Sequence, residues 1–206
     1  FTVTCKDGGE KIISFIPVQL ETGLQIMTCE DITERKALED RLAAMSVTDE
    51  LTGLYNRRGF FAVAQQQLKV AERARRHVVL FFADLDHMKE INDTLGHQEG
   101  DRALADAAFV LKQTFRESDI IGRIGGDEFA VFAVDAASET QDALLVRLQT
   151  ALQRQNRRAQ KYVLSMSVGT AHYDPQAPSS LDQLMAIADT MMYERKRKKE
   201  VHHCQH

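Results

Sequence analysis

The run from His77 to Ala83 constrains the fold of this chain more than any other stretch. It is apolar and lacks the polar alternation of a strand with one exposed face, so we expect a central strand that is buried on both faces. Asp84 follows at the C-terminal end of this strand. Because burying an unpaired carboxylate is costly, Asp84 is a candidate metal ligand whose charge a cation would compensate.

A second acidic site lies at a predicted β-hairpin. Two apolar, β-prone runs, Ser118–Ile124 and Phe129–Val134, flank Gly125-Gly126, which we expect to form a tight turn. The glycines would permit positive φ and would let a phosphate or nucleotide approach the backbone closely. Asp127-Glu128 follow on opposite faces of the strand, where they could bind Mg²⁺ and accept a proton from an attacking hydroxyl. An acidic surface turn is the alternative interpretation.

The composition is that of an ordinary globular protein. The chain has 206 residues, 44% hydrophobic and 27% charged, which suits one good-sized domain plus a fragment. The net charge of −4 gives no reason to expect a nucleic acid partner. No apolar run is long enough to span a membrane, so we expect no membrane contact from this segment. Three widely spaced cysteines favour a reducing, cytoplasmic location. Because the chain begins in a predicted strand at Phe1, we expect it to be a piece of a longer protein.

The N-terminal segment has the pattern of antiparallel strands. Residues 1–30 alternate as three short strands, separated by two turns that contain glycine. Three such strands bury little by themselves. Together with the following Asp31–Lys36, they resemble the C-terminal part of a PAS sensor domain, which we place at residues 1–32.

A linker helix is expected at residues 33–47. Asp31 and Glu34 have the spacing of a capping box. Apolar residues then recur at helical spacing, at Leu38, Leu42 and Met45. The helix could be a parallel coiled coil that transmits the state of the sensor, or it could pack on its own domain.

The rest of the chain is predicted to alternate between helices and strands. Asn56 is the expected N-cap of a helix that runs to about Arg76. Periodicity predicts further helices at 101–115, 137–158 and 181–199. It predicts one further strand at 162–172. The order is helix, strand, helix, helix, hairpin, helix, strand, helix. It predicts an α/β fold, an α+β sandwich with one mixed, mainly antiparallel central sheet flanked by helices.

Several separate motifs resemble a single family. The hairpin contains Gly-Gly-Asp-Glu-Phe, and Asp49–Arg58 reads D-E-L-T-G-L-Y-N-R-R. Asp84–Asp101 follows the pattern D-L-D-x-x-K-x-I-N-D-x-x-G-H-x-x-G-D, and a further motif covers Asp189–Lys196. Over about residues 46–200, the chain therefore resembles the GGDEF diguanylate cyclases.

The resemblance implies a fold and an activity. It assigns residues 48–200 to a palm-like nucleotide cyclase domain and leaves 201–206 as a tail. The implied reaction joins two GTP molecules into cyclic di-GMP and releases pyrophosphate, within a signalling protein. Because the product is two-fold symmetric, the implied enzyme is a homodimer in which two domains face each other. The implied cofactor is Mg²⁺ or Mn²⁺.

The resemblance also implies roles for individual residues. The metal would be held by carboxylates and one backbone carbonyl, from Asp84, Leu85, Asp127 and Glu128. The catalytic groups would be Asp127 as the base, with Glu128 and Lys89 as assisting charges. Substrate contacts would come from Leu51, Asn92, Asp101, Gly125, Gly126 and Lys196. An Arg-x-x-Asp pair that resembles the family's inhibitory product site consists of Arg116 and Asp119.

Single residues leave alternatives open. Leu51 could belong to the core, and Asn92 and Asp101 could be helix caps. Arg116 and Asp119 could form a surface ion pair. The combined spacing favours nucleotide contacts, in which an aspartate accepts the N1 and N2 hydrogens of guanine and so selects GTP.

Two positions depart from the family pattern. Met88 stands where phenylalanine is usual, and we expect a change in packing only. Glu200 stands where a phosphate-binding arginine is expected, and Lys198 or Lys199 could substitute for it as point charges. The alternative functions are a weak or inactive GGDEF domain that senses GTP or cyclic di-GMP, and an interaction scaffold within a longer chain.

Overall fold

The chain divides into two compact units, Phe1–Ser46 and Val47–His206. The computed structural model describes residues 2–4, 10–19, 25–38, 46–134, 141–158 and 161–203. Within these ranges, no helix combines the length and the apolar composition needed to cross a bilayer.

The N-terminal unit contains a three-stranded antiparallel sheet. Its strands are β1 (Thr2–Thr4), β2 (Glu10–Gln19) and β3 (Gln25–Asp31), in the order β1-β2-β3, as predicted. Residues 33–38 are helical, and Asp31 Oδ1 accepts a hydrogen bond from the Thr33 N–H at 3.1 Å. Leu42 and Met45 lie outside the described residues, so the coiled coil stays a prediction, as does the PAS resemblance.

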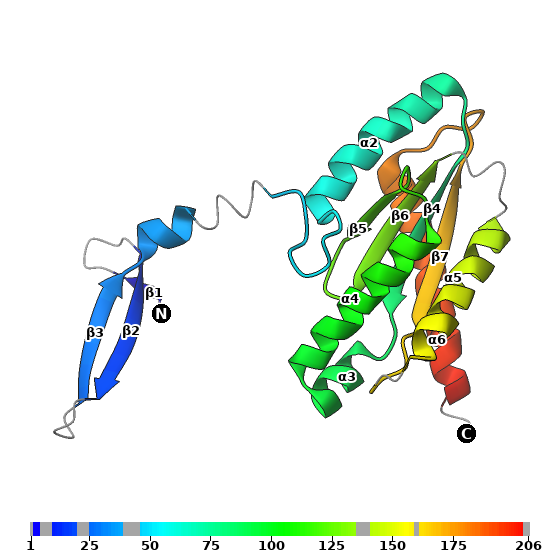
Figure 1. The fold of residues 1–206 in the computed structure, drawn as a ribbon. Coiled ribbons are helices and arrows are strands. Elements are labelled where there is room, and N and C mark those ends of the chain that lie inside the picture. The colour runs from blue at the N-terminus through cyan, green and yellow to red at the C-terminus, as the bar shows by residue number, and fades with distance from the viewer. Residues whose placement is uncertain are drawn as a thin grey trace. The chain divides into compact units, whose positions relative to one another are not determined.

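The larger unit is built on a four-stranded sheet (Figure 1). Its order is β5 (Ile120–Arg123), β6 (Glu128–Val134), β4 (Val78–Leu85) and β7 (Met166–Tyr173). The neighbouring strands are antiparallel, and an isolated parallel bridge joins Tyr55 to Gly122. The predicted fold class, a mainly antiparallel sheet flanked by helices, is confirmed.

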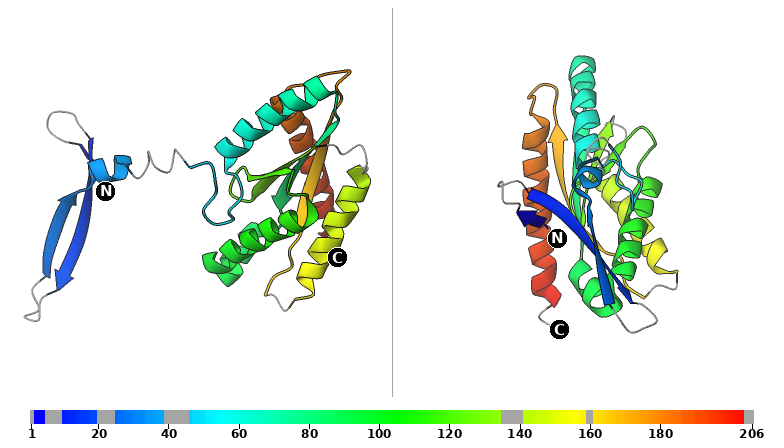
Figure 2. Two further views of the ribbon diagram at one scale, coloured as in Figure 1. Left: turned by 45° about the horizontal axis from the view of Figure 1, so that its top comes forward. Right: turned by 90° about the vertical axis from the view of Figure 1, so that its left-hand side faces the viewer.

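Helices cover both faces of this sheet (Figure 2). In chain order they are α2 (Arg57–Ala74), α3 (Met88–Leu95), α4 (His97–Thr114), α5 (Gln141–Asn156) and α6 (Leu181–His203). Residues of α2 and α6 share one buried cluster, and residues of α3, α4 and α5 share the other. The predicted order of elements is therefore confirmed.

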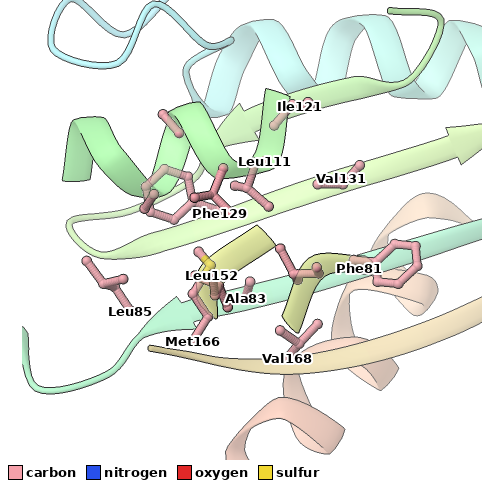
Figure 3. Packing of buried hydrophobic residues seen from close by; sticks show 14 of the residues in the cluster. Phe81, Ala83, Leu85, Leu111, Ile121, Phe129, Val131, Leu152, Met166 and Val168 are labelled. Carbon is pink, nitrogen blue, oxygen red and sulfur yellow. The ribbon is translucent and has the colours of Figure 1, made fainter. Parts of the chain in front are cut away.

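The central strand β4 connects the two clusters, and all eight of its residues are buried. Alternate residues such as Phe81 and Ala83 pack with α4 and α5 (Figure 3), whereas Leu80 and Phe82 pack with α2 and α6. A strand that is buried on both faces gains stability from apolar side chains on each, which explains why the sequence shows no polar alternation here.

Helix α2 matches the prediction closely. The Asn56 side chain accepts a hydrogen bond from the Gly59 N–H at 2.9 Å, as expected of an N-cap. The helix ends at a left-handed Arg75. Helical spacing predicts an apolar face made of Phe60, Ala64, Leu68 and Ala71, and all four residues are buried.

The hairpin is confirmed, but its turn is wider than predicted. Residues 124–127 separate the two strands, and the Ile124 N–H donates to the Glu128 carbonyl at 2.8 Å. Among the described glycines, positive φ occurs at Gly53 and Gly96 and at neither glycine of the hairpin. The longer loop reverses the chain without positive φ at Gly125 or Gly126, so the turn does not use the conformations that glycine would permit.

Other differences concern where elements begin. Helix α4 starts at His97, because Gly96, with a positive φ of 86°, ends α3 and the chain enters the next helix at once. Asn92 therefore lies inside α3 and Asp101 inside α4, so the helix-cap interpretation of both was wrong. Strand β7 starts at Met166 and not at 162. On α6, helical spacing predicts that Leu184, Ile187, Ala188 and Met191 face inward, but Ile187 is 51% exposed.

Helix α6 approaches β7 very closely at Gly169. A Cβ atom at this position would lie 1.9 Å from the Ala188 carbonyl oxygen and 2.3 Å from the Met192 nitrogen. Only glycine therefore allows this separation of helix and strand. The contact holds the following turns of α6 over the end of the sheet where β4 finishes.

Candidate active site

Acidic residues of β4 and β6 meet at one end of the sheet. Asp84 pairs in register with Glu128, and the Leu85 N–H donates to the Asp127 carbonyl at 3.0 Å. Because the strands are antiparallel, the end of β4 lies beside the start of β6. The central strand and the hairpin strand therefore lie side by side, and Asp84 and Asp127 come to the same end of the sheet.

Asp84 is paired with a lysine of α6. Its side chain is 10% exposed and accepts a hydrogen bond from Lys196 Nζ at 2.6 Å. Burial, and then the negative charges of Asp127 and Asp86, raise the pKa of Asp84 above its usual value, although Lys196 opposes this. Partial burial would lower the pKa of Lys196, but the neighbouring carboxylates raise it. The ammonium is thus the cation that compensates Asp84 in this structure.

Glu128 folds back over the glycine turn. A Cβ atom at Gly125 would lie 2.3 Å from Glu128 Oε2, whereas a Cβ at Gly126 would have no such atom within 4 Å. Burial, followed by the charges of Asp84 and Asp127, raises the pKa of Glu128. The backbone at Gly126 is therefore open to a ligand.

Asp86 forms a separate network that the sequence did not reveal. Its carboxylate accepts hydrogen bonds from the hydroxyls of Ser165 and Ser167, both at 2.6 Å, and from Lys199 Nζ at 2.8 Å. Lys199 also donates to the Met166 carbonyl at 2.8 Å. Burial acts to raise the pKa of Asp86, but these bonds outweigh it and hold the pKa below its usual value. The signal in the sequence was a Ser-x-Ser spacing at a strand start, which puts two hydroxyls on one face.

Asp86, Ser165 and Lys199 line a cleft of about 840 Å³. Its lining includes Asp127, Lys196 and Lys89, which were predicted to act on phosphates or metal, and further charged residues of which Lys198 and Lys199 are two. The volume suits a small-molecule ligand of nucleotide size. Carboxylates and lysines in one cleft can bind a polyphosphate together with a cation.

The residues expected to contact guanine lie apart from the lining of this cleft. Asn92 rests against Gly100, since a Cβ there would lie 2.0 Å from Asn92 Oδ1. Asp101 is the next residue and is exposed. The structure therefore brings Asn92 and Asp101 close together across the α3–α4 junction. Leu51 is 38% exposed, so its interpretation as a core residue was wrong.

The chemistry of the acidic residues suits a hard cation. Asp84, Asp127 and Glu128 present only oxygen atoms, which are the ligands that Mg²⁺ prefers. The ammonium of Lys196 at 2.6 Å from Asp84 shows that this carboxylate can hold a positive charge. Within the described ranges, no group of three or more His, Cys, Asp or Glu side chains is already arranged around a metal position.

Comparison with known proteins decides the family. Residues 46–202 match the family model described as diguanylate cyclase, GGDEF domain. The chain belongs to the GGDEF family of diguanylate cyclases. It is 36% identical over 158 residues to the "Probable diguanylate cyclase DgcC" of Escherichia coli K12, covering 76% of this chain and 42% of that protein. It is 31% identical over 188 residues to diguanylate cyclase DgcP of the same strain, covering 89% of this chain and 55% of that protein. This chain thus spans about half the length of these relatives.

Solved GGDEF domains have the same fold. The GGDEF domain of DgcB from Caulobacter crescentus, in complex with c-di-GMP, matches with a TM-score of 0.67 and 28% identity, over 74% of this chain and 91% of that one. The GGDEF domain of PA1120 from Pseudomonas aeruginosa matches with a TM-score of 0.65 and 35% identity, over 73% of this chain and 89% of that one.

The turn of this GGDEF domain is anchored by Arg123, for which no role was predicted. Its Nε and one terminal nitrogen donate to the Gly126 carbonyl at 3.0 and 2.7 Å. Its other terminal nitrogen lies 3.2 Å from Asp49 Oδ2. Asp49 also accepts the N–H and the hydroxyl of Thr52 at 2.9 and 2.6 Å. The opening motif of the GGDEF domain is therefore tied directly to its signature turn.

The predicted inhibitory pair of the GGDEF domain borders another cleft. Arg116 and Asp119 line a space of about 490 Å³, together with Lys112 and Tyr55. Asp119 accepts the backbone N–H of Arg116 at 2.9 Å and that of Val134 at 3.3 Å. Burial raises the pKa of Asp119 despite these bonds. The carboxylate is thus held rigidly at the edge of the cleft.

Proposed function

We propose that this chain condenses two GTP molecules into cyclic di-GMP and releases pyrophosphate. The observation that carries the proposal is the cleft of about 840 Å³, which is lined by Asp127 together with Lys89 and Lys196. Carboxylates suit a divalent cation, and lysines suit the phosphates that the cation accompanies. The named diguanylate cyclases among the relatives support the same reaction.

The donor set suits Mg²⁺ or Mn²⁺. The ion would be held by the carboxylates and the backbone carbonyl of Asp84, Leu85, Asp127 and Glu128. When bound, it would act as a Lewis acid toward phosphoryl oxygens and make a hydroxyl more acidic. The protein groups supply everything else in the reaction.

In the proposed reaction, the 3′-oxygen of each GTP bonds to the α-phosphorus of the other, so two phosphodiester bonds form and two pyrophosphates leave. The bond to the leaving pyrophosphate breaks, and Asp127 accepts the 3′-hydroxyl proton as general base. Lys89 and Lys196 would balance the charge that develops on the phosphoryl oxygens. The open backbone at Gly126 would admit the phosphates, and the guanine would be read by Leu51, Asn92 and Asp101.

The proposal requires two copies of the domain. Each cleft would hold one GTP, and the product is two-fold symmetric, so two domains must face each other across a two-fold axis. The segment before the domain, proposed as part of a PAS sensor followed by a linker helix, would control this pairing.

Direct assay of the product tests the proposal. The dimeric protein is incubated with GTP and Mg²⁺ or Mn²⁺, and pyrophosphate and cyclic di-GMP are quantified. Asp127→Asn should lower turnover by roughly 100-fold or more, because a base and a metal ligand are lost together. Asp182→Asn, an exposed carboxylate at the start of α6, should leave turnover unchanged. A verified dimer that forms no product with either ion would overturn the proposal.

A sensing function is the second candidate, and Glu200 favours it. The family pattern expects a phosphate-binding arginine where this chain has a glutamate. A sensor would bind GTP or cyclic di-GMP in calorimetry yet form no product in the assay above. Loss of both binding and turnover would leave the interaction scaffold.

We also propose that Arg116 and Asp119 form a site for inhibition by the product. An arginine can bind guanine and phosphate in a bidentate manner, and a rigidly held aspartate can accept ring hydrogens. Arg116→Ala should abolish inhibition by added cyclic di-GMP while initial turnover stays the same. The control is Arg73→Ala, an exposed arginine of α2 that should keep the inhibition curve of the original protein. An unchanged curve in Arg116→Ala would contradict this site.

A further inference from the structure

The end of α6 carries a row of cations, and most of them have partners within the domain. Arg195 donates to the Val168 carbonyl at 2.7 Å. Lys196 binds Asp84 at 2.6 Å, and Lys199 binds Asp86 at 2.8 Å. The two lysines lie three residues apart on α6. Asp84 lies near the end of β4 and Asp86 just beyond it, so successive turns of the helix meet successive acidic residues.

Lys199 is a poor candidate for binding phosphate. Its partner Asp86 is only 5% exposed, so removal of the ammonium would leave a buried carboxylate without its counter-charge. Lys199 also bonds the Met166 carbonyl at 2.8 Å. We therefore assign Lys199 to positioning Asp86, and with it the start of β7 against the end of β4.

Lys198 has the opposite properties. It is exposed and lines the same cleft of about 840 Å³ as Lys89 and Lys196. No buried carboxylate among the described residues relies on it for compensation, so its ammonium can turn toward a ligand at little cost. Arg197, the adjacent cation, is also exposed but does not belong to the lining of the cleft.

From this arrangement we infer that Lys198 binds the terminal phosphates of the nucleotide. It thereby makes the cleft specific for a triphosphate over a monophosphate, and it supplies the charge that Glu200 does not. The inference rests on the proposed function, because it takes GTP as the ligand. It identifies Lys198 as the residue that distinguishes a triphosphate from a monophosphate, and it excludes Lys199 from that role.

Equilibrium binding to Lys198→Ala and Arg197→Ala tests the inference. The probe is 3′-deoxy-GTP with Mg²⁺, because it carries the triphosphate but lacks the attacking hydroxyl and cannot be turned over. Lys198→Ala should weaken its binding by about tenfold, the effect of one charge-assisted hydrogen bond. Binding of GMP should change by less than about twofold, and Arg197→Ala should change neither ligand by more. Lys198→Arg should restore affinity for the triphosphate.

Several outcomes would contradict the inference. One is an equal loss of affinity for 3′-deoxy-GTP in Lys198→Ala and Arg197→Ala. Another is an equal loss of affinity for GMP and for 3′-deoxy-GTP in Lys198→Ala, and the last is no loss of affinity at all. If the original protein binds 3′-deoxy-GTP and Lys198→Ala binds it equally well, the inference is wrong and the proposed function stands. If the original protein does not bind 3′-deoxy-GTP, the proposed function itself fails.

The role of Lys199 has a separate readout. Lys199→Met should lower the midpoint of thermal unfolding, because Asp86 loses its counter-charge, and it should affect 3′-deoxy-GTP and GMP equally. If Lys199→Met loses affinity for 3′-deoxy-GTP but not for GMP, Lys199 is the phosphate-binding residue and the assignment of Lys198 is overturned.

Discussion

Two carboxylates at the end of β4 have opposite electrostatic environments. Asp84 and Asp86 are both buried, at 7% and 5% exposure. The pKa of Asp84 is raised by burial and by neighbouring acids, whereas hydrogen bonds from Ser165, Ser167 and Lys199 hold the pKa of Asp86 below its usual value. A carboxylate that the fold leaves under-compensated is a candidate for ligand binding, and one that the fold satisfies is structural.

This contrast predicts different effects for the two asparagine variants. Asp86→Asn should lower the free energy of unfolding by about 2 kcal/mol, because hydrogen bonds to a buried charge are lost. Asp84→Asn should change it by less than about 1 kcal/mol, because relief of repulsion offsets the lost pair with Lys196. Urea denaturation of both variants at neutral pH measures the difference. A larger loss in Asp84→Asn would refute the distinction.

Asp49 predicts a pH dependence of stability. Burial acts to raise its pKa, but Thr52 and Arg123 outweigh burial, so the pKa lies below its usual value. A carboxylate whose pKa is lowered by folding contributes stability above its unfolded pKa, near 4, and loses that contribution as pH falls through the folded value. Asp49→Asn should therefore cost roughly 1–2 kcal/mol at neutral pH and progressively less in acid. Unfolding curves collected between neutral pH and about pH 3 test this, and a pH-independent cost would contradict it.

At the scale of elements, the contact of α6 with β7 determines where the lysines lie. Helix and strand touch at Gly169, where a Cβ would meet helix backbone at 1.9 Å. Backbone cannot rotate away as a side chain can, so any larger residue must push α6 outward. A shift of the helix axis would move every cation beyond it relative to the carboxylates of β4.

Two glycine-to-alanine variants separate packing from ligand access. Gly169→Ala should lower stability by roughly 1–3 kcal/mol and weaken binding of 3′-deoxy-GTP as Lys196 shifts. Gly126→Ala should leave stability within about 0.5 kcal/mol, since its Cβ would enter open space without positive φ, but should reduce turnover by narrowing the access to the turn. Thermal unfolding and the product assay distinguish the two. Equal stability in both variants would show that α6 can move freely.

At the scale of the whole molecule, the larger unit contains its own core. Both buried clusters, from Leu54 to Met192, lie within residues 47–206. We therefore expect the isolated fragment 47–206 to unfold cooperatively and to bind 3′-deoxy-GTP as the longer chain does. Non-cooperative melting of the fragment would show that the first unit completes the core.

Turnover should depend on protein concentration in a way that binding does not. Because the proposed reaction needs two facing domains, the rate per mole of protein should rise with concentration until the dimer is saturated. Binding of 3′-deoxy-GTP to each domain should stay constant over the same range. A rate per mole that is independent of concentration below the dimerisation constant would contradict the two-domain mechanism.

Local patterns in the sequence were sufficient for much of the fold. The uninterrupted apolar run predicted a central strand, and the face of α2 from Phe60 to Ala71 was predicted in full. Asn56 could be predicted as an N-cap because its side chain bonds the backbone N–H of Gly59, only three residues along the chain. Burial periodicity and capping depend on neighbours along the chain, so the sequence contains them directly.

The pairing of charges was decided by tertiary structure. Lys196 reaches Asp84 across 112 residues, and Arg123 reaches Asp49 across 74. No local pattern indicates which of several lysines will meet a given carboxylate. That choice depends on how closely α6 approaches β7, and so on packing at Gly169. The sequence by itself determined the elements and the chemical groups, and the packing of helices on the sheet determined which groups meet, because contact between distant residues exists only in the folded chain.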